Sequence, residues 1–154
     1  MSTAEDYLQF AQMLLNGGKL NGKVLLSPRT VQLMASNHVG DMFNGKLGRP
    51  AHGMGYGLLV GVVEDSVAAG LRVSTGSFGW DGAYGTQAWI DPAEKMVTIV
   101  MIQTQVVSVQ RDFENAVMQA IMESSRSGAP AQRCREASAA VSVTSWSGGV
   151  GAGG

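Results

Sequence analysis

The chain has 154 residues, of which 45% are apolar and 15% are charged. This composition is typical of a folded domain rather than of a disordered chain. Its 11 basic and 12 acidic residues give a net charge of -1. Binding a phosphate backbone requires clustered Lys and Arg, so we expect no nucleic-acid partner.

The chain also lacks the signals of disulfide, export and membrane proteins. Cys134 is the single cysteine, which excludes an intrachain disulfide and gives no ligand set for zinc. The first ten residues, MSTAEDYLQF, carry acids where a signal peptide carries positive charge, so we expect no export signal. The apolar run at residues 97–102 is far shorter than the roughly 20 residues of a membrane span. We expect no membrane partner, and the compartment stays undetermined.

Two helices are predicted near the start. Thr3 can cap a helix whose apolar face runs over residues 4–16 and whose end is marked by Gly17 and Gly18. The pair Ser27-Pro28 repeats the pattern of a capping hydroxyl and a first-turn proline, and predicts a second, shorter helix.

A turn-rich surface loop is predicted at residues 40–53, and a sheet follows it. Its predicted strands occupy residues 56–63, 71–74, 85–90 and 95–103. A tight turn at Asp91-Pro92-Ala93-Glu94 joins the last two strands into an antiparallel hairpin, which we expect at the centre of the sheet. The last strand is almost entirely apolar, which predicts helices on both faces of the sheet.

A final helix and a tail complete the predicted organisation. Ser108 is a candidate cap for a helix that ends near Ser124 and lies across the sheet. Its apolar period is carried by Phe113, Ala116, Val117, Ala120 and Ile121. Residues 125–154 include 18 Gly, Ala or Ser residues and are predicted to be a disordered tail or a linker. The predicted fold class is therefore α+β over residues 1–124, with an antiparallel sheet of about four strands flanked by helices.

Residue types that often carry chemistry favour structural roles here. Neither His38 nor His52 has a partner at metal-ligand spacing, so we interpret both as capping or surface residues. Four carboxylates at strand ends and turns are expected to bind backbone N–H groups or face solvent, and four methionines are expected to fill the core. These residues are Glu64, Asp65, Asp91 and Glu94, and Met13, Met34, Met101 and Met118. We predict no metal and no cofactor.

The stretch SFGWDGAYGTQAWIDP, residues 77–92, holds a Trp between two glycines and a second Gly-aromatic-Gly step. From composition alone, Trp80, Asp81 and Gly82 are better interpreted as a turn that closes onto a hairpin than as part of a site. The chain contains no G-x-S-x-G, S-x-x-K, H-E-x-x-H or phosphate-binding loop. The residues by themselves therefore supply no activated nucleophile.

Three runs resemble the carboxy-terminal half of the serine β-lactamase-related hydrolases. They are residues 2–38, residues 53–63 (GMGYGLLVGVV) and residues 76–103 (GSFGWDGAYGTQAWIDPAEKMVTIVMIQ). That group includes the class C β-lactamases, the family VIII carboxylesterases and the D-aminopeptidases. The resemblance covers about residues 2–124 and includes the spacing between the runs. It implies an α/β-sandwich of the β-lactamase/transpeptidase-like type, incomplete in this chain.

The resemblance also implies a site. Its relatives combine an S-x-x-K motif, a Tyr-containing motif and a third motif written K-T-G, H-x-G or W-x-G. Trp80, Asp81 and Gly82 match the W-x-G form, which implies that they line the substrate cleft. Backbone N–H groups near Ala83 and Tyr84 are implied oxyanion donors. Asp81 stands where the esterase relatives commonly carry Gly, and we expect its charge to disfavour carboxylate substrates such as β-lactams.

Two functions remain open at this stage. The first is part of a serine hydrolase that cleaves esters or β-lactams through an acyl-enzyme, inactive by itself because the S-x-x-K and Tyr motifs are missing. Its partner would be a small ester or lactam, bound only when the missing half completes the cleft. The second is a non-catalytic binding or interaction module on the same scaffold. Whether the chain is an enzyme is therefore undecided by the sequence.

Overall fold

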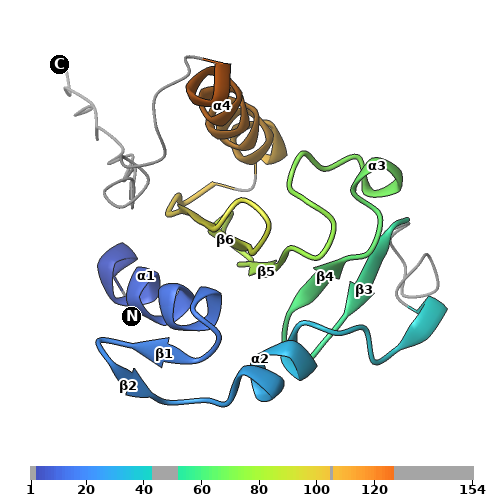
Figure 1. Ribbon diagram of the computed structural model, residues 1–154. Helices are drawn as coiled ribbons and strands as arrows, with labels where there is room; N and C mark the ends of the chain where they lie inside the picture. The colour runs from blue at the N-terminus through green and yellow to red at the C-terminus, as the bar shows by residue number, and fades with distance from the viewer. Residues whose placement is uncertain (1–2, 43–51, 105, 127–154) are drawn as a thin grey trace, which may run out of the picture.

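The computed structural model describes residues 3–42, 52–104 and 106–126. Within these ranges a five-stranded antiparallel sheet lies between helices, and a two-stranded ribbon stands apart from it (Figure 1). The strand order β3-β4-β5-β6-β7 follows the chain, so each strand pairs with its sequence neighbour. The α+β class and the antiparallel sheet are confirmed, with five strands in place of about four.

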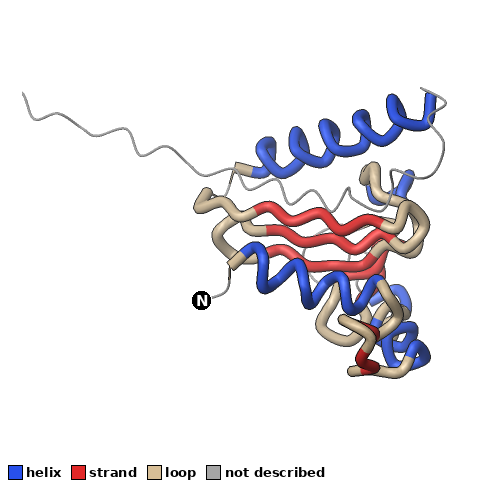
Figure 2. The backbone as a smooth tube through the Cα atoms, turned by 60° about the vertical axis from the view of Figure 1, so that its left-hand side comes forward, coloured by secondary structure: helices blue, strands red, loops and turns tan. Residues whose placement is uncertain are grey.

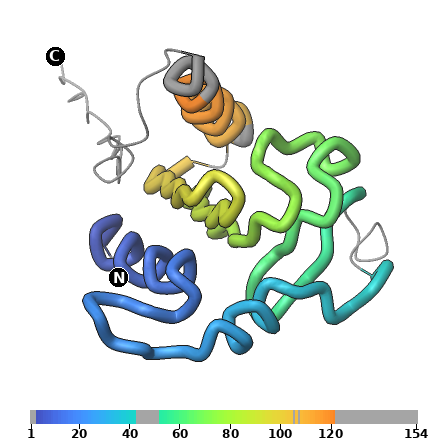
Figure 3. The backbone as a smooth tube through the Cα atoms, viewed as in Figure 1, coloured from blue at the N-terminus to red at the C-terminus, as the bar shows by residue number. Residues whose placement is uncertain are grey.

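The element bounds are as follows. The helices are α1 (Ala4–Leu15), α2 (Pro28–Met34), α3 (Ser66–Ala69) and α4 (Val107–Arg126), with a 3-10 turn η1 (Gly40–Met42). The strands are β1 (Lys19–Leu20), β2 (Lys23–Val24), β3 (Met54–Tyr56), β4 (Gly61–Val63), β5 (Phe78–Asp81), β6 (Gln87–Asp91) and β7 (Met96–Val100). Figure 3 follows the chain from α1 through the ribbon and α2 into the sheet and then to α4.

Both amino-terminal helices form as predicted. The hydroxyl of Thr3 accepts a hydrogen bond from the backbone N–H of Asp6 at 3.1 Å and caps α1. The hydroxyl of Ser27 accepts from the N–H of Thr30 at 3.1 Å, and Pro28 is the first residue of α2. Each cap satisfies a donor that the helix leaves without an internal partner, so local sequence is enough to fix these starts.

The predicted single strand at residues 56–63 is wrong, because the chain reverses inside it. The N–H of Gly57 donates to the carbonyl of Val60 at 2.8 Å, and Leu59 has a left-handed φ of 64°. A Cβ at Gly57 would overlap the carbonyl of Met34, so α2 packs closely against the start of this turn. Strands β3 and β4 form the two arms of the resulting hairpin.

The predicted strand at residues 71–74 is also wrong, and β5 was not predicted as a strand. Asp65 caps the short helix α3 by accepting from the N–H groups of Val67 and Ala68, each at 3.0 Å. The segment after α3 is irregular, and its Val73 is nevertheless only 3% exposed. Its backbone bonds to a side chain, since the N–H of Ser74 donates to the carboxylate of Asp91 at 2.9 Å.

The predicted hairpin is present as β6 and β7, and a turn at residues 92–95 joins these strands. Its position in the sheet differs from the prediction, because β5 is the central strand of the described sheet and β7 lies at its edge. The prediction placed the hairpin at the centre because strand β5 was missing from it.

Helices cover both faces of the sheet, as the apolar last strand predicted. Figure 2 shows α1 and α4 on opposite sides of the strands. On the α1 side, Phe78 and Ile90 are 2% and 5% exposed and pack with Ala11 and Leu14. On the other side, buried Val63, Val73 and Trp89 pack with partly buried Met118 of α4. Alternate strand residues thus supply two cores.

The carboxy-terminal helix is longer than expected and begins earlier. Ser108 lies inside α4, whose first residue is Val107, so its predicted role as a cap is wrong. Of the predicted apolar face, Phe113, Val117 and Ile121 are half-buried, whereas the two alanines at 116 and 120 are exposed. Residues 43–51 of the predicted loop and residues 127–154 of the predicted tail lie outside the described residues.

Candidate functional site

The W-x-G residues lie where a strand ends and a turn begins. Trp80 and Asp81 are the last two residues of β5 and pair with Ala88 and Gln87 of β6. Strand β4 pairs with β5 only as far as Gly79, so these two residues extend beyond it. The turn itself starts at residue 82, two residues later than the composition predicted.

Two glycines of this turn have no room for a side chain. The N–H of Gly82 donates to the carbonyl of Thr86 at 2.7 Å, and the N–H of Gly85 donates to the carbonyl of Gly82 at 3.0 Å. A Cβ at Gly82 would overlap the Thr86 hydroxyl. Gly85 has φ +93°, and a Cβ there would overlap the carbonyl of Thr104. The glycines therefore permit a tight turn that other residues would distort.

Helix α4 also contacts the turn after β5. The side-chain amide of Gln110 donates to the carbonyl of Gly85 at 2.9 Å. Gly85 thus lies between the segment at Thr104 and the first turns of α4, and it is buried. The position of the turn after β5 depends on α4 as well as on the sheet.

An aromatic contact fixes Trp80. Its ring meets Tyr56 of β3 edge to face, with the ring centroids 5.1 Å apart and the planes at 78°. A Cβ at Gly61 would lie 3.4 Å from the indole, so the ring also packs against the start of β4. Trp80 remains 43% exposed. The indole is therefore held in place and still offers surface to a ligand.

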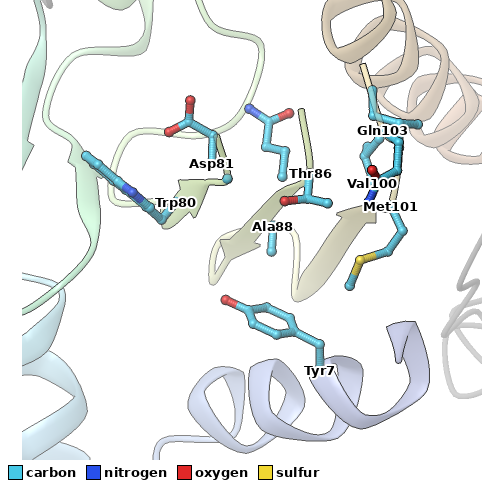
Figure 4. Close-up of a pocket in the computed structure, with 11 residues that line it drawn as sticks. Tyr7, Trp80, Asp81, Thr86, Ala88, Val100, Met101 and Gln103 are labelled. Carbon is cyan, nitrogen blue, oxygen red and sulfur yellow. The ribbon is translucent and has the colours of Figure 1, made fainter. Parts of the chain in front are cut away.

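A cavity of about 550 Å³ lies at this end of the sheet, between the strands and α1 (Figure 4). Its lining residues come from α1, from the ends of β5, β6 and β7, and from the segment after β7. They are Tyr7, Trp80, Asp81, Gly82, Thr86, Gln87, Ala88, Val100, Met101, Ile102 and Gln103. Volumes of this order accommodate small organic ligands.

The structure brings together part of the predicted site. Trp80, Asp81 and Gly82 line the cavity. Ala83 and Tyr84 follow in the turn but are not among the residues that line it, and Tyr84 is 69% exposed. The prediction that these five residues bind substrate stays a prediction.

Several lining residues were missed by the sequence interpretation. Tyr7 lies in the predicted first helix, residues 4–16, where no binding role was expected, and Met101 was expected to fill the core. Figure 4 shows the Tyr7 phenol pointing from α1 toward the strands, opposite Ala88. Thr86 and Gln103 carried no sequence signal at all. Tyr7 joins the site only because α1 packs against the sheet, which no local pattern encodes.

The charge of the cavity lining is negative. Among the described residues that line it, Asp81 is the only charged one. Its carboxylate is exposed and makes no hydrogen bond or ion pair with any described residue. No described residue of the lining is a His or Lys, the side chains that most often activate a hydroxyl. These residues can orient a ligand, and no nucleophile with an adjacent base lies among them.

The histidines outside the cavity support the structural interpretation. A ring nitrogen of His38, Nε2, lies 2.7 Å from the carbonyl of Leu33 near the end of α2, which confirms a capping contact. His52 is exposed in the turn before β3. Residues 3–42, 52–104 and 106–126 contain no cluster of three or more His, Cys, Asp or Glu residues able to hold a metal ion.

The four turn carboxylates have structural contacts or face solvent. Asp91 is 1% exposed and accepts from three backbone N–H groups, while Asp65 caps α3. Glu64 accepts from the side-chain amide of Asn37 at 3.0 Å, and Glu94 is exposed.

Of the helices in the described ranges, none has the length and apolarity of a membrane span.

Comparison with known proteins places this geometry in context. The family model "Beta-lactamase" matches residues 1–121. Proteins Rv1367c and MT1414, from two strains of Mycobacterium tuberculosis, are each 38% identical over 108 residues. The match covers 66% of this chain and 27% of each relative. The chain thus spans less than a third of the length of these curated relatives.

Two solved structures have a similar fold. EstCE1, "a hydrolase with promiscuous acyltransferase activity", has a TM-score of 0.51 and 31% identity, over 62% of this chain and 23% of that one. The protein named "Putative 6-aminohexanoate-dimer hydrolase" from Bacillus anthracis has a TM-score of 0.55 over 79% of this chain and 30% of that one. Its identity of 24% supports the fold alone.

Proposed function

Since the chain belongs to the β-lactamase family, we propose that Trp80, Asp81 and Gly82 form one wall of a hydrolase cleft that receives a small ester or lactam. The observation that carries the proposal is that all three residues line one cavity at the end of β5. They combine a fixed aromatic surface with a glycine that lets a substrate approach the backbone.

The substrate would lie along the end of β5. Trp80 and Asp81 extend beyond β4, while their pairing with β6 keeps this backbone extended. A carbonyl held near the following turn would be close to the N–H groups around Ala83 and Tyr84. Such N–H groups stabilise the oxyanion of an acyl-transfer transition state when they are fixed in advance. The glycines and Gln110 supply that rigidity here.

The role of this wall is positioning. Acyl transfer needs a nucleophile and a base beside it, and the sequence holds no S-x-x-K motif. We infer that both groups come from a segment other than these 154 residues, and that this chain alone hydrolyses neither esters nor lactams. The hydrolytic activity of an intact protein would arise when that segment faces the wall.

The alternative is a non-catalytic binding module. It is favoured by the same absence of a nucleophile motif, because a cavity can hold a ligand without reacting with it. A binding module and a cleft wall both require ligand at residues 80–82. They differ in whether a nucleophile-bearing polypeptide restores turnover.

The test has two stages. First, the purified chain is incubated with a chromogenic short-chain ester and a chromogenic cephalosporin, next to a heat-treated control, and we expect no turnover. A fluorophosphonate adduct detected by mass spectrometry would contradict the absence of an activated hydroxyl. Second, ethyl butyrate is titrated into the ¹⁵N-labelled chain, and we expect the largest shifts at the amides of residues 80–82. Shifts confined to other residues would reject the cleft wall.

A further inference from the structure

The interface between α1 and the sheet is filled at one end and open at the other. In the filled part, Ala11 and Leu14 of α1 pack against Phe78 of β5 and Ile90 of β6, which are directly opposite each other on these strands. All four residues are at most 5% exposed. This part is a hydrophobic core in which large side chains fill the space between the helix and the strands.

Further along the same elements, the space is not filled. Tyr7 lies one helical turn before the packed residues of α1, and Trp80 and Ala88 form the next strand pair on the α1 face. Ala88 thus occupies, with a much smaller side chain, the place that Ile90 has in the filled part. The Trp80 ring does not cover Ala88, because the indole is directed toward β3, where it contacts Tyr56 (Figure 4). The cavity therefore opens above Ala88.

The side chains around this space are mostly apolar. Figure 4 shows the Tyr7 ring opposite Ala88 and the Met101 thioether on the same side of the strands, and all three residues line the cavity. Apart from the Tyr7 hydroxyl, these side chains offer only carbon, sulfur and hydrogen to a ligand. A thioether also adapts its shape to the group that it contacts. The group that such a space favours over water is a small apolar one.

We propose that the space between Tyr7, Ala88 and Met101 receives a short unbranched alkyl chain of the ester, and that the small side chain of Ala88 sets the length of chain that fits. Ala88 is a specificity-determining residue in this assignment. Its use for a substrate rests on the proposed function, because the ester group itself would lie at residues 80–82. The chain of the acyl group and the chain of the alcohol have the same chemistry, and two isomeric esters distinguish them.

Three esters measure the contribution of the chain. Ethyl butyrate and butyl acetate are isomers that carry the longer chain on the acyl side and on the alcohol side, and ethyl acetate is the short reference. Each is titrated into the ¹⁵N-labelled 154-residue chain, and dissociation constants are taken from the amide shifts of residues 80–82. We expect the isomer whose chain enters the pocket to bind about three- to tenfold more tightly than ethyl acetate, because further CH₂ groups are buried. Equal binding of all three esters would overturn the proposal.

Enlarging residue 88 locates the chain. Ala88→Leu fills the space above the strand and should reduce the advantage of the better isomer over ethyl acetate to less than about twofold, and Ala88→Val should give an intermediate loss. Ala116→Leu makes the same enlargement at an exposed position of α4 and should alter no dissociation constant. Because Ala88→Leu enters a cavity, it should not lower the midpoint of thermal unfolding. A large decrease would mean that residue 88 is already fully packed, and would overturn the proposal.

A contact measurement on the unmodified chain does not depend on any variant. The terminal methyl group of the longer chain in the bound ester should give nuclear Overhauser effects to the ring protons of Tyr7 and to the methyl group of Met101. Contacts of that methyl group with other residues alone would place the chain elsewhere and reject the pocket.

The outcomes separate the two proposals. If the esters shift residues 80–82 but neither chain length nor Ala88→Leu has an effect, the pocket is overturned and the cleft wall stands. If the chain contacts Tyr7 without any shift at residues 80–82, the pocket stands as an apolar site and the cleft wall is rejected. If neither is observed, both proposals fail.

Discussion

Two aspartates end neighbouring strands and differ in almost every physical respect. Asp81 is the last residue of β5, and its carboxylate is exposed and unpaired among the described residues. Asp91 is the last residue of β6, is 1% exposed and accepts hydrogen bonds from Ser74, Ala93 and Glu94. The surroundings of a strand-end carboxylate therefore decide whether it binds backbone N–H groups of the fold or stays exposed.

The largest expected effect is at the buried aspartate. Asp91→Asn replaces one acceptor oxygen by an amide donor, so the N–H of Ser74 or of the turn residues loses its partner. We expect the variant to lower the free energy of unfolding by about 2–4 kcal/mol, as for a broken buried network. Urea unfolding followed by circular dichroism measures the change. Asp81→Asn is the matched control and should change stability by less than about 0.5 kcal/mol. Similar losses of unfolding free energy in the two variants would contradict the distinction between Asp91 and Asp81.

Two glycines with similar backbone conformations show in the same way that the surroundings of a residue decide the cost of replacing it. Gly85 and Gly76 have φ of +93° and +91°, but only Gly85 has a carbonyl, that of Thr104, in the space that a Cβ would fill. Gly76→Ala should cost about 1 kcal/mol of unfolding free energy from backbone strain alone, and Gly85→Ala roughly 2–3 kcal/mol. Thermal unfolding of the two variants separates conformational strain from steric overlap. Equal costs would mean that the turn at the cavity relaxes freely.

Replacing Trp80 tests whether the proposed cleft wall binds a ligand. Trp80→Ala removes the surface that packs against Tyr56, and we expect affinity for ethyl butyrate to fall about three- to tenfold, as for loss of roughly 1 kcal/mol of apolar and aromatic contact. Tyr84→Ala is the control, because Tyr84 is exposed and outside the lining. If Tyr84→Ala lowers the affinity and Trp80→Ala does not, the ligand binds at the turn after β5 and not at Trp80.

The smallest effect is expected at the contact with α4. Gln110→Ala removes the hydrogen bond to the Gly85 carbonyl and should cost about 0.5–1.5 kcal/mol. Hydrogen exchange of the Gly82 and Gly85 amides should accelerate, since both lie in the turn that this bond holds. Gln119→Ala, at an exposed position of the same helix, should leave that exchange unchanged. Equal acceleration would indicate general loosening of α4.

Local sequence was sufficient wherever the deciding contacts are local. Thr3, Ser27 and Pro28 set the starts of α1 and α2 through groups within three residues of each cap. The apolar character of β7 correctly predicted helices on both faces of the sheet. The quoted runs also identified the family, because their residues and spacing are features of the chain itself.

Contacts between distant segments decided the rest. The reversal between β3 and β4 and the burial of the irregular segment at Val73 depend on α2 and on the core beneath α4. Tyr7 lines the cavity only because α1 packs on the sheet. Sequence alone assigned both Asp81 and Asp91 to turns, one before and one after the predicted strand at residues 85–90. Only the packed structure separates them, because burial and the nearby N–H groups determine whether a carboxylate is bonded within the fold, as Asp91 is, or stays exposed, as Asp81 does.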